Sequence, residues 1–178
     1  MTDSPGFHVD NLKGKIKSFT RGYLFNVYFT NVPSVEALAS DETKFLVRSS
    51  STPEATIDPI EIPWQGQTYK IGSTHTFGDW SCTFMVDGNA ELLKNFYKWQ
   101  KNVHNLDTNV HGVPEDYLGE ATVELLNVEG KSTIKYELHQ LWPTAVAGVE
   151  IAQDSKEVST VDVTFAYQWH TIEGLGYK

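Results

Sequence analysis

Six histidines, one cysteine and a surplus of acidic side chains are the groups in this 178-residue chain that could do chemistry. Two histidines bind zinc when a spacing such as HExxH brings both rings to one face of a helix. The histidines stand at positions 8, 75, 104, 111, 139 and 170, and no two of them have a paired-ligand spacing. No GxGxxG, P-loop or GxSxG motif occurs either. The sequence therefore predicts no metal site, no cofactor and no catalytic residue.

The single cysteine, Cys82, excludes an internal disulfide and cannot hold a zinc ion alone. Its place in an alternating apolar strand predicts a small buried side chain and not a nucleophile. Acidic residues are abundant, but nothing pairs two of them as the general acid and base of a hydrolase. The tryptophans at positions 64, 80, 99, 142 and 169 fit a ligand pocket or packing in the core and between subunits, and packing is the simpler role.

The composition is that of a single folded domain, residues 1–178, with an apolar fraction of 40%. No apolar run reaches the roughly 20 residues that a membrane-spanning helix needs, and the first residues do not have the pattern of a secretory signal. We therefore expect no membrane anchor and folding in a reducing cytoplasm. The net charge of −9 disfavours a surface that grips nucleic-acid phosphates. It allows a protein that lies near DNA without binding it tightly.

Hydrophobic periodicity predicts a mainly β fold with antiparallel strands and one convincing helix, without βαβ alternation. Residues 1–21 are interpreted as an extended N-terminal arm and residues 171–178 as a short C-terminal tail. Residues 104–118 are expected to form a polar loop, and residues 143–156 a connection. The strand patterns cover residues 23–29, 45–48, 55–63, 68–76, 77–86, 120–128, 133–142 and a long final stretch at 161–169.

The stretch TFGDWSCTFMVDG, residues 76–88, alternates with a period of two residues and stops at Asp-Gly. An apolar stripe at helical spacing follows within residues 92–103, and Asp87 or Asn89 is placed to cap its start. We expect this helix to dock over the apolar face of the strand. The core candidates are Trp80, Cys82, Phe84, Leu92, Phe96 and Trp99.

Two further strands, residues 120–128 and 133–142, are joined by Glu129-Gly130-Lys131 and predict a hairpin. Each strand alternates polar and apolar residues, so the polar sides of the two strands lie together and face water. The polar side carries Glu120, Thr122, Glu124, Thr133, Lys135, Glu137 and His139.

Five segments in a fixed order resemble the tail tube protein of contractile-tailed bacteriophages. They are RGYLFNVYF, THTFGDWSCTFMVDG, LLKNFYKWQ, LWPTAVAGVEI and STVDVTFAYQWH, and the resemblance covers roughly residues 20–170. The most specific pieces are residues 76–80, 98–100 and 141–143. Residues before Arg21 and the loop around 105–117 match nothing in the family.

The resemblance implies two packed antiparallel sheets, a sandwich or partial barrel with one flanking helix, and no enzymatic activity. It implies that six copies form a ring and that rings stack into a hollow tube, the inner conduit of a contractile tail in the virion. The expected partners are further copies of the chain and the tail sheath, tape measure and baseplate proteins, after synthesis in the host bacterial cytoplasm. DNA passes through such a tube without tight binding. The polar side of the hairpin at 120–142 would then line the lumen.

The sequence leaves other functions open. A tube-initiating baseplate protein and the tube of a phage-derived secretion or killing particle share the expected fold. A monomeric β-barrel that binds a small apolar ligand is a different class, favoured by the tryptophan content. We also expect the hairpin at residues 53–76 and the arm before Arg21 to reach neighbouring subunits, because neither shows the apolar alternation of the final strand.

Overall fold

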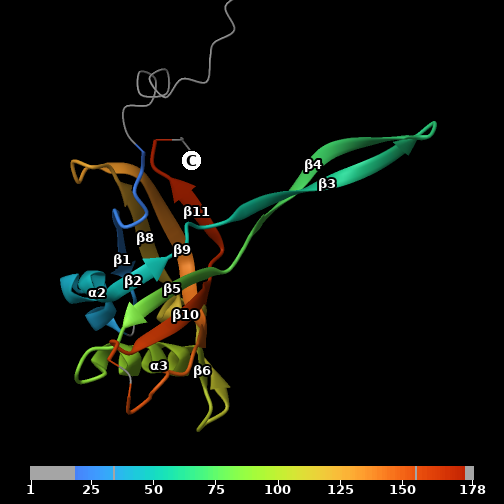
Figure 1. Cartoon of the computed structure of the whole chain (residues 1–178). Helices are drawn as coiled ribbons and strands as arrows, with labels where there is room; N and C mark the ends of the chain where they lie inside the picture. The colour runs from blue at the N-terminus through green and yellow to red at the C-terminus, as the bar shows by residue number, and fades with distance from the viewer. Residues whose placement is uncertain (1–18, 34, 155, 175–178) are drawn as a thin grey trace, which may run out of the picture.

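The computed structural model describes residues 19–33, 35–154 and 156–174. Antiparallel strands dominate these residues, and the sheet does not close into a barrel (Figure 1). The predicted mainly β fold is therefore confirmed. Of the predicted arm, only residues 19–21 belong to the described part of the chain. Among the described helices, none has the length and apolar character to cross a membrane.

The longest strand, β9 (Ser132–Val146), belongs to both layers of the fold. Its first part pairs with β8 (Gly119–Leu126) and β11 (Trp169–Ile172), and β1 (Phe25–Asn31) continues this first sheet beyond β8. Its last part pairs with β10 (Thr160–Ala166), which leads to β5 (Trp80–Met85) and β2 (Val47–Ser50) in the second. Gln140 has a φ of 54° at the junction. This left-handed residue marks the point where β9 passes from one sheet to the other.

The core fills the space between the two sheets. The first sheet contributes residues such as Phe29 and Val123, and the second contributes Phe165, all at most 2% exposed. The Phe29 ring lies 6.2 Å from that of Phe84 and 5.7 Å from that of Phe165. These aromatic contacts across the layers hold the sheets together.

Helix α3 (Glu91–Val103) covers one end of this core (Figure 1). Phe96 is fully buried and packs against Phe29 and Phe84 at 6.2 and 4.9 Å between ring centroids. The structure places all six core candidates inside, with exposed fractions of 0–5%: Trp80, Cys82, Phe84, Leu92, Phe96 and Trp99. Gly119 permits this packing, because a Cβ there would lie only 2.9 Å from the Trp99 ring.

Strands β3 (Ala55–Trp64) and β4 (Gln67–Phe77) form a long hairpin that leaves the body of the molecule (Figure 1). Gln65 and Gly66 form its turn with φ of 45° and 82°, so the predicted turn at Trp64-Gln65-Gly66-Gln67 is confirmed. Every residue of β3 is exposed. The hairpin therefore contributes nothing to the core of its own chain beyond its root.

Several element boundaries differ from the sequence-based expectation. Phe45, expected in a strand, lies in helix α2 (Asp41–Leu46), which follows the short 3-10 helix η1 (Glu36–Ala39). The expected connection from residue 143 begins with strand, because β9 runs on to Val146. The polar loop contains a small hairpin, β6 (His104–Asn105) and β7 (Val110–His111), and helix α4 (Pro114–Tyr117).

The expected final strand is two strands. β10 ends at Ala166 and β11 begins at Trp169, because both run along β9 and the chain must turn where β9 bends at Gln140. β11 also extends through Thr171 and Ile172, so the C-terminal tail expected from residue 171 begins with strand. Of that tail, only residues 173–174 continue beyond the strand within the described part.

Candidate assembly surfaces

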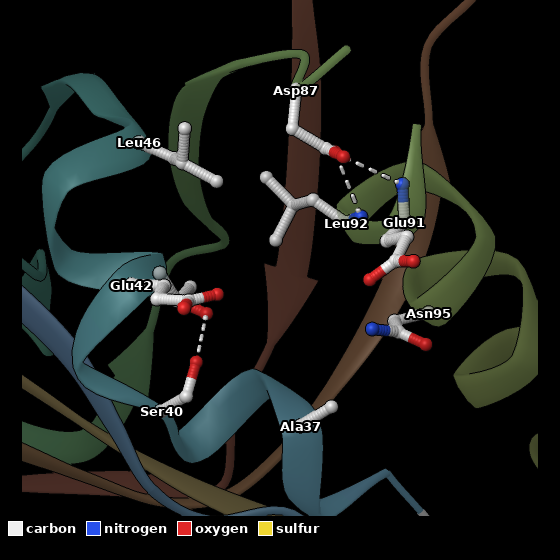
Figure 2. A pocket seen from close by; sticks show the side chains of 9 residues that line it. Ala37, Ser40, Glu42, Leu46, Asp87, Glu91, Leu92 and Asn95 are labelled. Carbon is white, nitrogen blue, oxygen red and sulfur yellow. Dashed lines mark hydrogen bonds between the residues drawn. The ribbon is translucent and has the colours of Figure 1, made fainter. Parts of the chain in front are cut away.

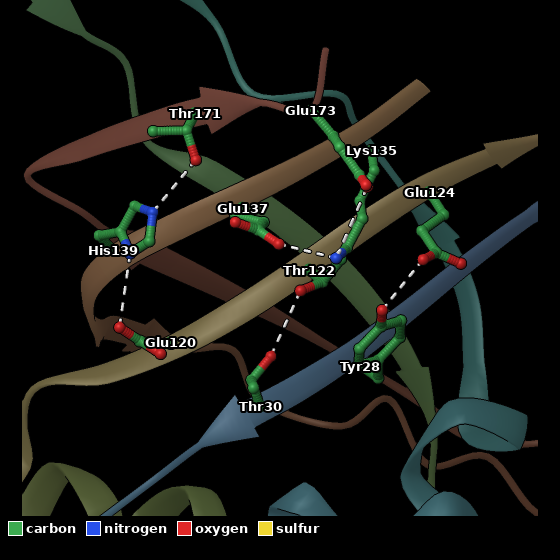
Figure 3. Close-up of polar contacts among 10 residues, drawn as sticks. All are labelled: Tyr28, Thr30, Glu120, Thr122, Glu124, Lys135, Glu137, His139, Thr171 and Glu173. Carbon is green, nitrogen blue, oxygen red and sulfur yellow. Dashed lines mark hydrogen bonds and ion pairs between the residues drawn. The ribbon is translucent and has the colours of Figure 1, made fainter. Parts of the chain in front are cut away.

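The outer side of the first sheet carries a continuous set of polar side chains, which we call the polar face (Figure 3). The pairing of β8 with β9 sets Glu120 opposite His139, Thr122 opposite Glu137 and Glu124 opposite Lys135. The register places the predicted polar sides of the two strands together. The polar face consists of Tyr28, Thr30, Glu120, Thr122, Glu124, Lys135, Glu137, His139, Thr171 and Glu173.

Hydrogen bonds and ion pairs cross the polar face from strand to strand (Figure 3). Lys135 Nζ lies 2.7 Å from an oxygen of Glu137 on the same strand, and 3.8 Å from Glu173, which follows β11. Tyr28 donates its hydroxyl hydrogen to Glu124 over 3.0 Å, which joins β1 to β8. His139 connects two more strands, with Nδ1 3.4 Å from Glu120 Oε1 and Nε2 3.2 Å from the Thr171 hydroxyl.

The electrostatics of the polar face follow from these contacts. The hydrogen bond with Glu137 raises the pKa of Lys135, and the same bond lowers the pKa of Glu137. Burial, then the bond to the Glu124 carboxylate, raises the pKa of the Tyr28 hydroxyl. The pair Lys135–Glu137 is therefore fully charged at neutral pH. Four glutamates stand against one lysine among the ten residues, so the polar face is net negative.

Two of the lumen candidates sit differently from the rest. Thr122 is on the polar face but only 3% exposed, so the expectation that it meets water is wrong. It lies between longer neighbours, and its hydroxyl is 3.3 Å from that of Thr30 on β1. Thr133 is exposed, at the irregular start of β9 where the register shifts between Leu125 and Leu126.

Sequence reasoning missed the contributions of β1 and β11 to the polar face. Tyr28 and Thr30 alternate with the buried Val27 and Phe29, so the alternation in β1 was a usable signal. The contribution of Thr171 had no such signal, since its side depends on the interruption of the final strand after Ala166.

The β3–β4 hairpin carries an exposed apolar surface near its turn, which we call the hairpin tip. Cross-strand pairs put Ile60 beside Ile71, Ile62 beside Tyr69 and Trp64 beside Gln67 on one side. The other side is polar, with Lys70 and Glu61 joined by a 2.7 Å ion pair. The apolar side chains are 42–70% exposed: Ile60, Ile62, Trp64, Tyr69 and Ile71. A contiguous apolar patch of this kind marks a contact surface.

A cleft of about 330 Å³ opens where the hairpin leaves the core, and we call it the root cleft. Phe77 is one of its lining residues, and its ring centroid lies 4.8 Å from that of His75 and 5.3 Å from that of His170. Burial, reinforced by nearby His75, lowers the pKa of His170, so this ring is neutral at pH 7. The lining includes Ala55, His75, Phe77, Trp169, His170 and Ile172.

The remaining groups that could react, a cysteine and a set of carboxylates, lie in places where they support the fold. Cys82 is 2% exposed, and burial raises the pKa of its thiol to about 12, so it is not a nucleophile at neutral pH. A hollow between α2 and α3 has three carboxylates at its edge, and Asp87 is held there by the N–H groups of Glu91 and Leu92, both at 3.1 Å (Figure 2). In the described part of the chain, no three histidine, cysteine or acidic residues are placed to hold a metal ion.

Comparison with known proteins decides the family. The family model described as phage tail tube protein matches residues 18–173, nearly the whole described fold. This chain belongs to the phage tail tube protein family. The polar face, the hairpin and the root cleft all lie within the matched range.

The tail tube relatives are distant but cover most of the chain. The tail tube protein gp19 of Enterobacteria phage T4 is 26% identical over 128 residues, 70% of this chain and 78% of that protein. The tail tube protein of Serratia phage KSP90 is 24% identical over 136 residues, 72% of this chain and 77% of that protein.

Solved structures with the same fold come from contractile injection systems. The anti-feeding prophage tube-terminating cap has a TM-score of 0.66 at 15% identity and covers 89% of this chain and 93% of its own. The sheath–tube complex of the PVC extracellular contractile injection system has a TM-score of 0.62 at 17% identity, with 89% and 93% covered. These similarities establish the tail tube fold and confirm the predicted fold class.

Proposed function

We propose that this chain is the subunit of the inner tube of a contractile phage tail. Six copies form a ring, rings stack into a tube, and the polar face of each copy lines the bore. The observation that carries the proposal is the net negative polar face on a sheet whose edge strand β1 pairs on one side only among the residues that the structure describes. Head-to-tail contacts around a rotation axis close such sheets into a ring and cover their edges.

The charge of the polar face suits a conduit for DNA. A protein grips DNA when its lysines and arginines displace the counterions of the phosphates. The polar face offers one lysine, and Glu137 already pairs with it at 2.7 Å. Fixed carboxylates repeated around a ring repel the phosphate backbone, so DNA passes without being held.

The partners in this proposal are other copies of the chain and the proteins that surround a tail tube. The sheath and the baseplate contact its outside and its end, and a tape measure protein occupies the bore during assembly. The hairpin and the N-terminal arm reach neighbouring subunits. The chain works in the virion after synthesis in the bacterial cytoplasm, and its role is structural and not enzymatic.

Negative-stain electron microscopy of the purified chain tests the proposal. We expect open-ended tubes or isolated rings, with tubes at the higher protein concentrations. Isolated rings that never stack would indicate the tube-initiating variant of the function. A monodisperse monomer whose tryptophan fluorescence is quenched by small apolar ligands would instead favour a ligand-binding protein and refute the tube.

A further inference from the structure

Each subunit carries two exposed apolar surfaces, the hairpin tip and the root cleft, at opposite ends of one hairpin. Trp64 at the tip is 70% exposed, and Trp169 beside the cleft is 40% exposed. The ten residues of β3 separate the two surfaces by about 30 Å at the usual rise per strand residue. A subunit therefore cannot cover its own root cleft with its own tip.

We infer that the hairpin tip of one subunit docks into the root cleft of the next copy of the chain. The inference rests on the proposed tube function and names the surface that receives the hairpin. One copy provides a protruding surface and the other a recessed one, which is a head-to-tail contact that can repeat from copy to copy.

Charge supports this choice of occupant. Copies with a net charge of −9 repel one another, so they approach best where both surfaces are uncharged. The apolar side of the tip bears only uncharged side chains, because Lys70 and Glu61 pair on the other side. The cleft lining has no carboxylate, lysine or arginine, and burial lowers the pKa of His170, one of its two histidines.

The chemistry of the two surfaces also matches. Trp64 and Tyr69 present flat rings with polar atoms at their edges, a type of side chain enriched at the centres of interfaces. The cleft presents the rings of Phe77, Trp169 and His170, with His139 stacked on Trp169 at 5.4 Å. Aromatic rings that meet in offset or edge-on arrangements attract one another beyond the effect of area alone.

The docking contact would pass from one subunit to the next. The root cleft is built partly from the hairpin's own first and last residues, Ala55 and Phe77. A tip that fills the cleft therefore fixes the direction of the receiving subunit's hairpin, which points that hairpin toward the following copy. Docking at one position prepares docking at the next, and assembly becomes cooperative.

Cysteine cross-linking in assembled tubes tests the contact. Gln67 pairs with Trp64 on the apolar side of the tip, and its neighbour Thr68 points to the other side. We expect Gln67→Cys with Ala55→Cys to give covalent ladders of subunits under oxidation, and Thr68→Cys with Ala55→Cys to give little. Native Cys82 does not interfere, because it is 2% exposed with a thiol pKa of about 12.

A second measurement does not need new cysteines. Trp64→Ala should raise the protein concentration required for tubes at least about tenfold, since truncation of a central tryptophan is costly at interfaces. Tyr97→Ala, at a 48% exposed aromatic on α3, serves as the control and should change it little.

The outcomes separate this inference from the proposed function. Tubes without ladders, or equal ladders from both cysteine pairs, would overturn the docking contact and leave the tube proposal intact. Tubes in which a cysteine introduced into the N-terminal arm cross-links to Ala55→Cys would overturn it too, because another segment would then fill the cleft. A chain that remains monomeric at every concentration would overturn both.

Discussion

The hydroxyl group of Tyr167 donates a 2.9 Å hydrogen bond to the backbone carbonyl oxygen of Glu54, immediately before the β3–β4 hairpin. The same oxygen accepts the Gly78 N–H at 3.2 Å, just after the hairpin. One carbonyl thus joins both ends of the hairpin to the residue that follows β10. This bond fixes the hairpin to the core.

Tyr167→Phe should loosen the hairpin root. The Glu54 carbonyl oxygen is then left with the Gly78 N–H as its one donor. Loss of a hydrogen bond of this kind costs about 0.5–1.5 kcal/mol of stability. We expect faster amide hydrogen exchange at residues 54–57 and 75–78, with little change in α3. Tyr23→Phe, at a 68% exposed tyrosine, is the matched control. Unchanged exchange at the root would show that the ring contacts alone hold the hairpin.

Acid should weaken the root through His170. Burial and His75 lower the pKa of His170 below its usual 6.5, so the unfolded chain binds the proton more readily than the folded one. This contribution to stability is complete above pH 6.5 and is lost as the pH falls from there toward the folded-state pKa. The melting temperature of the unassembled subunit should therefore fall between pH 7.5 and 5.5.

His170→Gln should remove part of that pH dependence, because the remaining side chain does not titrate. The His111 ring lies outside the root, 4.3 Å from the His104 ring between centroids, and His111→Gln should retain the pH dependence. If the melting temperature of the His170→Gln variant depends on pH as steeply as that of the wild type, the acid sensitivity belongs to other groups.

Trp80→Ala should destabilise the subunit by about 3–5 kcal/mol, the usual range for truncation of a buried aromatic ring. Trp80 is fully buried, stacks on Phe165 at 5.1 Å, and donates its indole N–H to the Ser51 carbonyl at 2.9 Å. Urea denaturation of the unassembled subunit measures the loss. Trp142→Ala, at a partly exposed tryptophan, should cost less. A Trp80→Ala melting temperature within a degree or two of wild type would contradict this.

Asp87→Ala should destabilise the start of α3 by about 0.5–2 kcal/mol, the range for loss of an N-terminal cap. The Asp87 carboxylate accepts the N–H groups of Asn89, Glu91 and Leu92 at 3.1–3.2 Å. Asp87→Asn retains an acceptor and should recover part of the loss, whereas Asn89→Ala should cost little. Circular dichroism during denaturation measures all three. Equal stability of the Ala and Asn variants would refute the capping role.

Charge reversal on the polar face tests the bore. Glu120, Glu124 and Glu137 changed together to lysine should leave tubes intact but slow genome ejection, because the wall would then attract phosphates. The effect should be strongest at low salt, where charges are screened over about 30 Å at 0.01 M instead of about 10 Å at 0.1 M.

The matched control makes the same change of charge away from the polar face, at Glu36, Glu115 and Glu150. Ejection from virions that carry either triple variant, followed by release of labelled DNA, compares the two. Equal rates would refute the role of the polar face, as would a tube structure with these three side chains on the outside.

Local patterns were sufficient for much of this fold. The alternation around Trp80, the stripe through Phe96 and the turn at Gly66 each depend on neighbouring residues, and each was predictable. The bend of β9 at Gln140 was not, because a left-handed glutamine has no local signal. The interruption before Trp169 follows from that bend and was missed with it.

For the candidate surfaces too, local patterns predicted some features, and others depend on residues far apart in the sequence. Alternation predicted which residues of β8 and β9 share a side, but the burial of Thr122 depends on long neighbours from other strands. The root cleft combines Ala55 with Trp169, more than a hundred positions away. Only the folded chain brings those residues together.

The two prolines of β3 have a protective consequence. Pro59 and Pro63 lie opposite Gly72 and Thr68. These positions alternate with the pairs that are hydrogen-bonded across the hairpin from the turn onward. A backbone N–H at either position would therefore point away from β4, to the free edge of β3, and proline lacks this N–H group. An exposed apolar hairpin is otherwise a template for amyloid-like stacking. The edge without these donors resists the addition of a stray strand, while the apolar side of the tip stays available. Before assembly, the hairpin therefore offers a stray strand a poor template along its edge, while its apolar side remains free for a specific contact.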